Sequence, residues 1–252
     1  MSRTIALLVL APVLMYAFAC LMLYATQRHL VFFQVPRLDK SLPTVSLRTE
    51  VGDVLVSTRA HAGPRAVVYF GGNAEDVSLT VSDLALAFPD RAVFALHYRG
   101  YGGSAGSPGE RELVADGLAL FDLVHVTQAD ITVIGRSLGS GVAMQVAAAR
   151  PATQLVLVTP YDSLADVGAV HYPIFPVRWL SRDPFDSVAV APEVTMPVTI
   201  IAAADDRIVP MRNTRRLEAA FRPQQSRFVV LPHAGHNFDL TPEYLHALQQ
   251  LP

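Results

Sequence analysis

The run from Ile134 to Gly141 holds the residues whose types and spacing point most directly to chemistry. Ser137 is the centre of a G-x-S-x-G pentapeptide that follows an apolar, strand-like stretch and precedes a helix-like stretch. A serine on such a sharp turn is exposed, and Gly135 and Gly139 allow the chain to make the turn. Because a helix would begin directly after the serine, its free N–H groups would face a developing oxyanion. The pattern predicts a nucleophilic Ser137.

A serine hydroxyl needs a base, usually a histidine that a carboxylate orients. On strand-turn-helix nucleophiles of this type, the order along the chain is Ser, then Asp or Glu, then His. Asp206 follows the apolar stretch 198–203, and His236 follows the apolar stretch 228–231. Both residues would therefore leave the same sheet edge as Ser137. We predict a triad of Ser137, Asp206 and His236.

Two neighbouring residues compete for these roles. Asp205 could cap the turn or serve as the acid itself, although the D-x-x-V-P spacing after Asp206 favours Asp206. His233 follows Pro232 and could line the mouth of the site, whereas His236 lies deeper in its loop. The choice between Asp205 and Asp206 stays open on the sequence alone.

An oxyanion hole requires two hydrogen-bond donors. The backbone N–H of Leu138, directly after the nucleophile, is the first candidate. The second should come from the Gly71-Gly72-Asn73-Ala74 turn that follows the apolar stretch 66–70. Within that turn we favour the N–H of Asn73.

The rest of the chain alternates between strand-like and helix-like stretches. Such alternation predicts an α/β fold with a mostly parallel central sheet and helices on both faces. Ligands of such sheets bind outside the carboxyl ends of the strands, where every candidate above falls. The expected strands are 45–51, 54–59, 66–70, 92–97, 131–134, 155–159, 198–203 and 228–231, with the first two joined through Gly52-Asp53. The expected helices include 77–87, 142–149, 212–221 and 242–250.

Two further segments carry local signals. Ser107-Pro108-Gly109-Glu110 looks like a capping box with proline at the first helical position, ahead of another helix. The stretch from about 160 to 197 is rich in prolines and interleaved aromatic residues, so it cannot form one long helix. We expect it to form a small cap with an apolar inner surface over the sheet edge.

The N-terminus predicts a membrane anchor. The stretch 5–25 carries no charge. Its length matches the about 20 residues that a membrane-spanning helix needs. A cleaved signal peptide is the alternative, since Ala17-Phe18-Ala19 precedes Cys20, but the apolar run continues beyond this point. We therefore expect an anchor at 1–28, a linker at 29–43 and a catalytic domain at 44–252.

Composition excludes several classes. The net charge of −2 and the lack of a basic patch argue against nucleic-acid binding. Cys20 is the only cysteine, so the chain cannot form an internal disulfide, and no spacing of ligands suggests a metal site. Lys40 is the only lysine and lies in the linker, which argues against a Ser–Lys dyad. The preference for arginine over lysine points to a GC-rich bacterial gene and hence to an inner membrane.

Orientation in that membrane is only weakly determined. Arg3 and the free amine favour a cytoplasmic N-terminus, and so an extracytoplasmic catalytic domain, while Arg28 and Arg37 compete on the other side.

At these residues the chain resembles the Bem46-like group of membrane-anchored serine hydrolases in the α/β-hydrolase superfamily. The matching segments are 27–33, 69–75, 98–104 with its R-G-Y-G-x-S pattern, 135–139, 182–187, 206–210 and 234–237. The resemblance implies the α/β-hydrolase fold and hydrolysis of an ester, thioester or lipid acyl bond, with no metal or organic cofactor. The anchor and the aromatic cap favour an apolar acyl chain.

Gly71 departs from the pattern of that group, which usually has a histidine there. The loss of the histidine could alter the oxyanion loop or widen the pocket. It is the one feature that favours a second hypothesis, in which the chain is a non-catalytic ligand- or partner-binding protein on the same fold.

Overall fold

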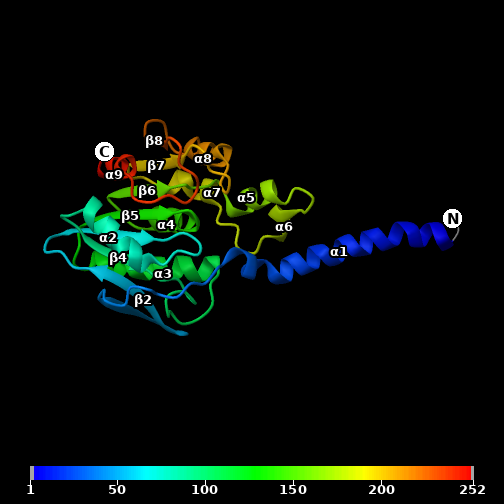
Figure 1. The fold of residues 1–252 in the computed structure, drawn as a ribbon, viewed down its shortest axis with the longest axis horizontal. Helices are drawn as coiled ribbons and strands as arrows, with labels where there is room; N and C mark the ends of the chain where they lie inside the picture. The colour runs from blue at the N-terminus through cyan, green and yellow to red at the C-terminus, as the bar shows by residue number, and fades with distance from the viewer. Residues whose placement is uncertain (1–2, 251–252) are drawn as a thin grey trace.

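An eight-stranded sheet forms the centre of the protein, in a computed structural model that describes residues 3–250 (Figure 1). The strand order is β1-β2-β4-β3-β5-β6-β7-β8; β1 pairs antiparallel with β2 and β2 with β4, and all other pairs are parallel. The strands are β1 Thr44–Thr49, β2 Gly52–Arg59, β3 Arg65–Phe70, β4 Ala92–Leu96, β5 Asp130–Arg136, β6 Gln154–Val158, β7 Val198–Ala203 and β8 Ser226–Leu231. The inner strands β6 and β7 are buried along their whole length, as expected of continuous apolar strands covered on both faces.

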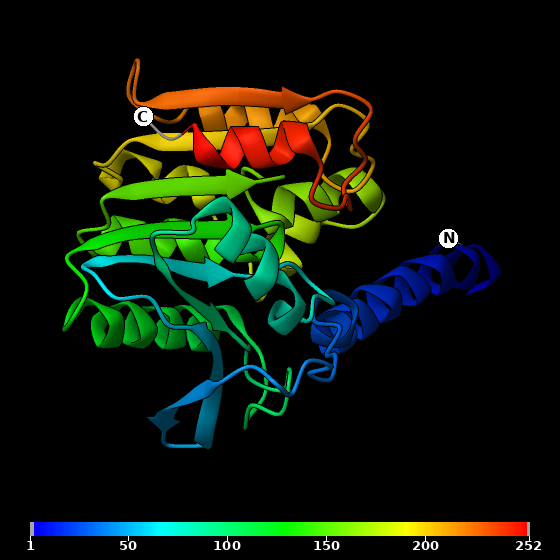
Figure 2. The same cartoon turned by 60° about the vertical axis from the view of Figure 1, so that its left-hand side comes forward.

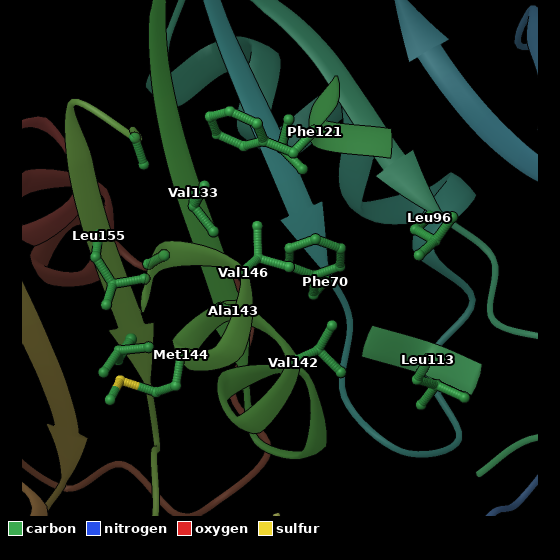
Figure 3. Close-up of a cluster of buried hydrophobic side chains, with 14 of the residues drawn as sticks. Phe70, Leu96, Leu113, Phe121, Val133, Val142, Ala143, Met144, Val146 and Leu155 are labelled. Carbon is green, nitrogen blue, oxygen red and sulfur yellow. The ribbon is translucent and has the colours of Figure 1, made fainter. Parts of the chain in front are cut away.

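Helices cover both faces of this sheet, which confirms the predicted fold class (Figure 2). The helices are α1 Arg3–Val31, α2 Val77–Ala87, α3 Glu110–His125, α4 Leu138–Ala149, α5 Leu164–His171, α6 Val177–Leu180, α7 Ser187–Val190, α8 Met211–Glu218 and α9 Pro242–Gln249, with a 3₁₀ turn at Ala191–Glu193. On one face, α3 and α4 pack on the strands through a cluster that includes Phe70, Phe121, Val133 and Val146 (Figure 3). On the other face, α2 and α9 cover a second cluster.

Two local predictions are wrong in detail. The β1–β2 hairpin turns at Glu50 and Val51, because Gly52 has a φ of 119° and already pairs with Thr49. The expected capping box does not form either, since α3 begins at Glu110 with Gly109 as its N-cap and no side-chain cap.

A tertiary contact replaces the capping box. The Glu110 N–H donates to Asp183 Oδ1 over 2.8 Å, and Glu110 Oε2 accepts from the Phe185 N–H over 2.8 Å. The start of α3 is therefore stabilised by a segment 73 residues further along the chain, which Ser107 and Pro108 could not reveal.

The stretch 160–197 has two parts. Its second half, with α7 and the 3₁₀ turn, packs on α4, and Phe185, Ala191 and Val194 lie fully buried in the core. Its first half forms α5 and α6, which project from the sheet toward α1 (Figure 1). Only this first half has the character of a cap, and we use the name cap for residues 164–181.

Helix α1 extends away from the sheet (Figure 1). Its stretch Leu10–Val31 is long and apolar enough to cross a membrane, and none of that stretch is buried in the protein. At its end, Arg28 makes two hydrogen bonds of 2.8 and 2.9 Å to the buried carboxylate of Asp183. This bidentate ion pair fixes the direction in which α1 leaves the domain.

We expect the buried His97 to make the protein less stable in acid. Its ring is 2% exposed directly after β4, and its Nε2 is 2.8 Å from Ser57 Oγ. Burial lowers the pKa of His97 to about 4, whereas the unfolded chain has a histidine pKa of about 6.5. The unfolded state therefore binds the proton more readily between these values, and the free energy of unfolding falls as the pH falls from about 6.5 to about 4, by roughly 3 kcal/mol in all.

Urea denaturation in detergent micelles across this pH range checks the prediction. The variant His97→Gln should lose less stability than the wild type as the pH falls. Equal pH dependence of the two proteins would contradict it.

Candidate active site

Ser137 occupies a strained turn between β5 and α4. Its φ of 49° and ψ of −117° are unusual for a residue with a side chain, and α4 starts at the next residue. A Cβ atom on Gly139 would overlap the carbonyl oxygen of Phe70, and one on Gly135 would overlap the carbonyl oxygen of Gly139. The two glycines thus let α4 approach the ends of β3 and β5, and this close approach holds Ser137 out at the carboxyl edge of the sheet.

The three predicted triad residues meet at this edge. His236 Nε2 lies 2.7 Å from Ser137 Oγ, and His236 Nδ1 lies 2.7 Å from Asp206 Oδ2. The loops after β7 and β8 bring Asp206 and His236 to the serine, as the parallel register of these strands requires. The His236 and Asp206 side chains are 8% and 5% exposed, so little water competes for this pair.

Asp206 rather than Asp205 makes the contact. The carboxylate of Asp206 also accepts hydrogen bonds from the N–H groups of Ile208 and Val209, at 2.9 and 2.8 Å. These two amides fix the orientation of Oδ2 toward the imidazole. Asp205 is exposed, as is His233. The structure therefore brings Ser137, Asp206 and His236 together and leaves both competitors outside.

The turn after β3 faces the serine. Gly72 and Asn73 line the same pocket as Ser137 and His236, a pocket of about 590 Å³. The N–H of Gly72 donates to Glu75 Oε2 over 2.6 Å, so this amide is already occupied. Of the two predicted donors, Asn73 lies on the turn after β3 and lines this pocket, and Leu138 is the first residue of α4, directly after Ser137.

Glu75 organises this turn, a role that the sequence did not reveal. Its Oε1 accepts from Tyr69 and Thr80 hydroxyls, both over 2.7 Å, while its Oε2 holds Gly72. Burial raises the pKa of Tyr69 well above its usual range, so the phenol stays protonated and remains a donor. Nothing in the spacing of these residues signals the network, because its donors come from β3, the turn and α2.

The side chain of Asn73 connects the turn to the chain that leaves α1. Its Oδ1 accepts from the Phe33 N–H at 2.9 Å, from the Tyr101 hydroxyl at 3.0 Å and from the Ala74 N–H at 3.1 Å. The backbone of the turn is therefore held both from inside by Glu75 and from outside by the linker. Such support keeps backbone donors in fixed positions before a charge develops.

Gly71 faces α2 and does not line the pocket beside Ser137. A Cβ atom at this position would overlap Cγ1 of Val77, and the Gly71 carbonyl accepts from the Tyr98 hydroxyl over 2.9 Å. Val77 therefore fills the space that a side chain at position 71 would occupy, and the glycine does not widen the pocket.

We expect Gly71→Ala to destabilise the protein by about 1–3 kcal/mol, the usual result of overpacking a buried position. The double variant with Val77→Ala should show a favourable coupling energy, because Val77→Ala removes the overlapping methyl group. Gly235→Ala is the matched control, since a Cβ there meets no atom within 4 Å. Chemical denaturation of the wild type, the two single variants, the double variant and Gly235→Ala measures these values, and strict additivity of the two substitutions would contradict the contact.

Known proteins show which superfamily the chain belongs to, although no protein-family model matches it. The uncharacterized protein Rv2307c of Mycobacterium tuberculosis is 38% identical over 256 residues, which cover 94% of this chain and 90% of that protein. The α/β-hydrolase domain-containing protein WAV2 of Arabidopsis thaliana is 26% identical, over 85% of this chain and 82% of that protein. The lysophosphatidylserine lipase ABHD12 of Macaca fascicularis is 29% identical over 154 residues, which are 53% of this chain and 39% of that protein.

A solved structure agrees with these relatives. A putative hydrolase from Agrobacterium vitis superposes with a TM-score of 0.66 at 18% identity, over 82% of this chain and 96% of that one. The strand order and the turn that carries Ser137 define an α/β-hydrolase fold. The chain belongs to the α/β-hydrolase superfamily.

Proposed function

We propose that this protein is a membrane-anchored serine hydrolase that cleaves ester, thioester or lipid acyl bonds through an acyl-enzyme on Ser137. The observation that carries the proposal is the continuous chain of contacts from Ser137 Oγ through His236 to Asp206, each 2.7 Å long. A nucleophile in contact with a base, and a base in contact with an orienting carboxylate, is the arrangement that activates a serine.

The reaction follows from the positions of these groups. Ser137 Oγ attacks the acyl carbon while its proton passes to His236 Nε2, and Asp206 stabilises the imidazolium that forms. The N–H groups of Leu138 and Asn73 bind the oxyanion. When the tetrahedral intermediate collapses, the leaving alcohol or thiol takes the proton from His236. Water then attacks the acyl-enzyme by the same route, releasing the acid and restoring the serine.

Two observations support a lipid-like acyl substrate at a membrane. Helix α1 has the length and the exposed apolar surface of a membrane anchor, and it lies on the N-terminal side of the catalytic domain. One relative is a lysophosphatidylserine lipase, and a lipase acts on acyl esters of this kind. We place the protein in a bacterial inner membrane, as a single-pass protein with residues 1–28 as the anchor and 44–252 as the catalytic domain.

Labelling with a fluorophosphonate probe tests the activated serine. The full-length wild type should label, whereas Ser137→Ala and His236→Ala should not, and His233→Ala should label like the wild type. A folded wild type that fails to label would sink the hydrolase proposal and favour ligand binding on the same fold.

A further inference from the structure

The cap contacts the middle of α1 as well as its end. The Tyr16 hydroxyl donates to the Ile174 carbonyl oxygen over 2.8 Å, and the Tyr16 ring stacks on Phe175 with centroids 6.0 Å apart. Near the end of the helix, Gln27 donates to the Leu180 carbonyl oxygen over 3.0 Å. Figure 1 shows α6 beside α1. The cap therefore follows α1 from Tyr16 to Gln27, which is about 16 Å along a helix axis.

We propose that the tip of the cap, residues 172–179, inserts into the lipid bilayer beside α1. The proposal rests on the anchoring part of the proposed function and is independent of the hydrolytic part. The depth of the Tyr16 contact within the membrane supports it first. About 20 helical residues span a hydrocarbon core of about 30 Å. Even if Arg3 marks the far boundary, the near boundary lies at about residue 23, and Tyr16 lies about 10 Å inside it.

The surface of the cap tip matches a lipid environment. Tyr172, Ile174 and Trp179 are 53%, 71% and 90% exposed, all on one short segment next to an apolar helix. Exposed apolar side chains that gather in this way mark an interaction surface. Tryptophan and tyrosine prefer the boundary between hydrocarbon and headgroups, where one end of the ring is apolar and the other polar.

The backbone of the cap tip also suits a bilayer, where water cannot satisfy free N–H groups. Prolines at 173 and 176 remove two donors. Within this segment the amides of Tyr172, Phe175, Val177 and Trp179 donate to carbonyl groups of the cap, as do those of Leu180 and Ser181 just after it. Ile174 in turn supplies the acceptor that the Tyr16 hydroxyl needs at mid-span.

The arginines in and just after the cap tip are paired or lie at the membrane boundary. Within the tip, Arg178 pairs with Asp166 at the start of α5. Just after the cap, Arg182 lies over the Tyr24 ring with its guanidinium carbon 5.7 Å from the centroid. Arginine side chains commonly reach the membrane boundary in this way while their stems stay in apolar surroundings. The pattern sets the boundary at the level of Tyr24.

An apolar cavity of about 180 Å³ lies between these contacts of the cap with α1 and is lined by residues of both. Its walls offer water few hydrogen-bond partners, whereas a hydrocarbon chain from the bilayer fits their chemistry. The lining includes Leu23 and Leu30 of α1 and Val167, Phe175, Val177 and Leu180 of the cap.

Trp179 is the only tryptophan of the chain and serves as a native probe. We would reconstitute the full-length protein in phosphatidylcholine vesicles that contain lipids brominated at a shallow or a deep acyl position. Trp179 emission should be blue-shifted and quenched by the shallow bromines, and iodide should quench it poorly. A tryptophan at Ile174, in the variant Ile174→Trp/Trp179→Phe, should be quenched more strongly by the deep bromines, because Ile174 lies opposite Tyr16.

Two controls, both with Trp179→Phe, separate the possible failures. Leu21→Trp reports on the exposed surface of α1, and Val126→Trp reports on an 81% exposed position just beyond the C-terminal end of α3. Quenching by bromolipids at position 21 without quenching at 174 and 179 would overturn the insertion of the cap and leave the anchor standing. A lack of quenching at all three positions would overturn the anchor as well. If the tip instead docks on a protein, Trp179 in these protein-free vesicles will be open to iodide, and this too would overturn the proposal.

Discussion

Replacing His236 with alanine is expected to lower kcat for an acyl ester by roughly 10⁴- to 10⁶-fold, because the serine then has no base and the leaving group no acid. The other histidine of the same loop, His233, is exposed, while His236 Nε2 is the atom that lies 2.7 Å from Ser137 Oγ. KM should change little, since the imidazole acts on the reacting bond and contributes little to ground-state binding.

Turnover of a short-chain nitrophenyl ester by the purified full-length protein measures this effect. His233→Ala is the matched control and should leave kcat essentially unchanged. Adding imidazole to His236→Ala should restore part of the activity if only the base has been lost. Activity in His236→Ala within tenfold of the wild type would remove His236 from the mechanism.

The second large effect is expected for Asp206→Asn, at about 10⁴-fold in kcat. The amides of Ile208 and Val209 require an acceptor at Oδ1, so the asparagine NH₂ group will face His236 Nδ1. That N–H forces the imidazole proton onto Nε2, which then points a donor at Ser137 and can no longer accept its proton. The substitution keeps the shape of the site and reverses one hydrogen bond.

Asp205→Asn tests the specificity of this argument, because Asp205 is adjacent in the chain and exposed. Its kcat should match the wild type, and both variants should unfold at the same denaturant concentration as the wild type within error. A larger loss for Asp205→Asn than for Asp206→Asn would reverse the assignment of the acid.

Local sequence determined the elements that carry the site. The apolar runs at 66–70, 155–159 and 198–203 predicted buried parallel strands, and the glycines at 135 and 139 predicted a tight turn around Ser137. These signals can be read from the sequence because alternation, helical spacing and glycine at a crowded turn depend on residues only a few positions apart. The expectation that Ser137, Asp206 and His236 meet then followed from the rule that parallel strands end at one edge.

Contacts between distant residues determined the rest. The sequence left Asp205 and Asp206 open, because a shift of one residue on a loop reverses which side chain faces the histidine. The start of α3 depends on Asp183, and the turn that carries Asn73 depends on Glu75, Tyr69 and the linker at Phe33. No local pattern encodes such pairs.

The sequence by itself predicted a nucleophile, its two partners in order, a parallel sheet to hold them and an apolar N-terminal helix. Only the tertiary structure decided which carboxylate contacts His236, what holds the turn after β3, and that the cap lies along α1 at Tyr16. The physical reason is the distance along the chain over which each kind of interaction acts. Backbone preferences and hydrophobic periodicity act over a few residues, whereas the contact between Tyr16 and Ile174 joins positions 158 residues apart and exists only once the chain has folded.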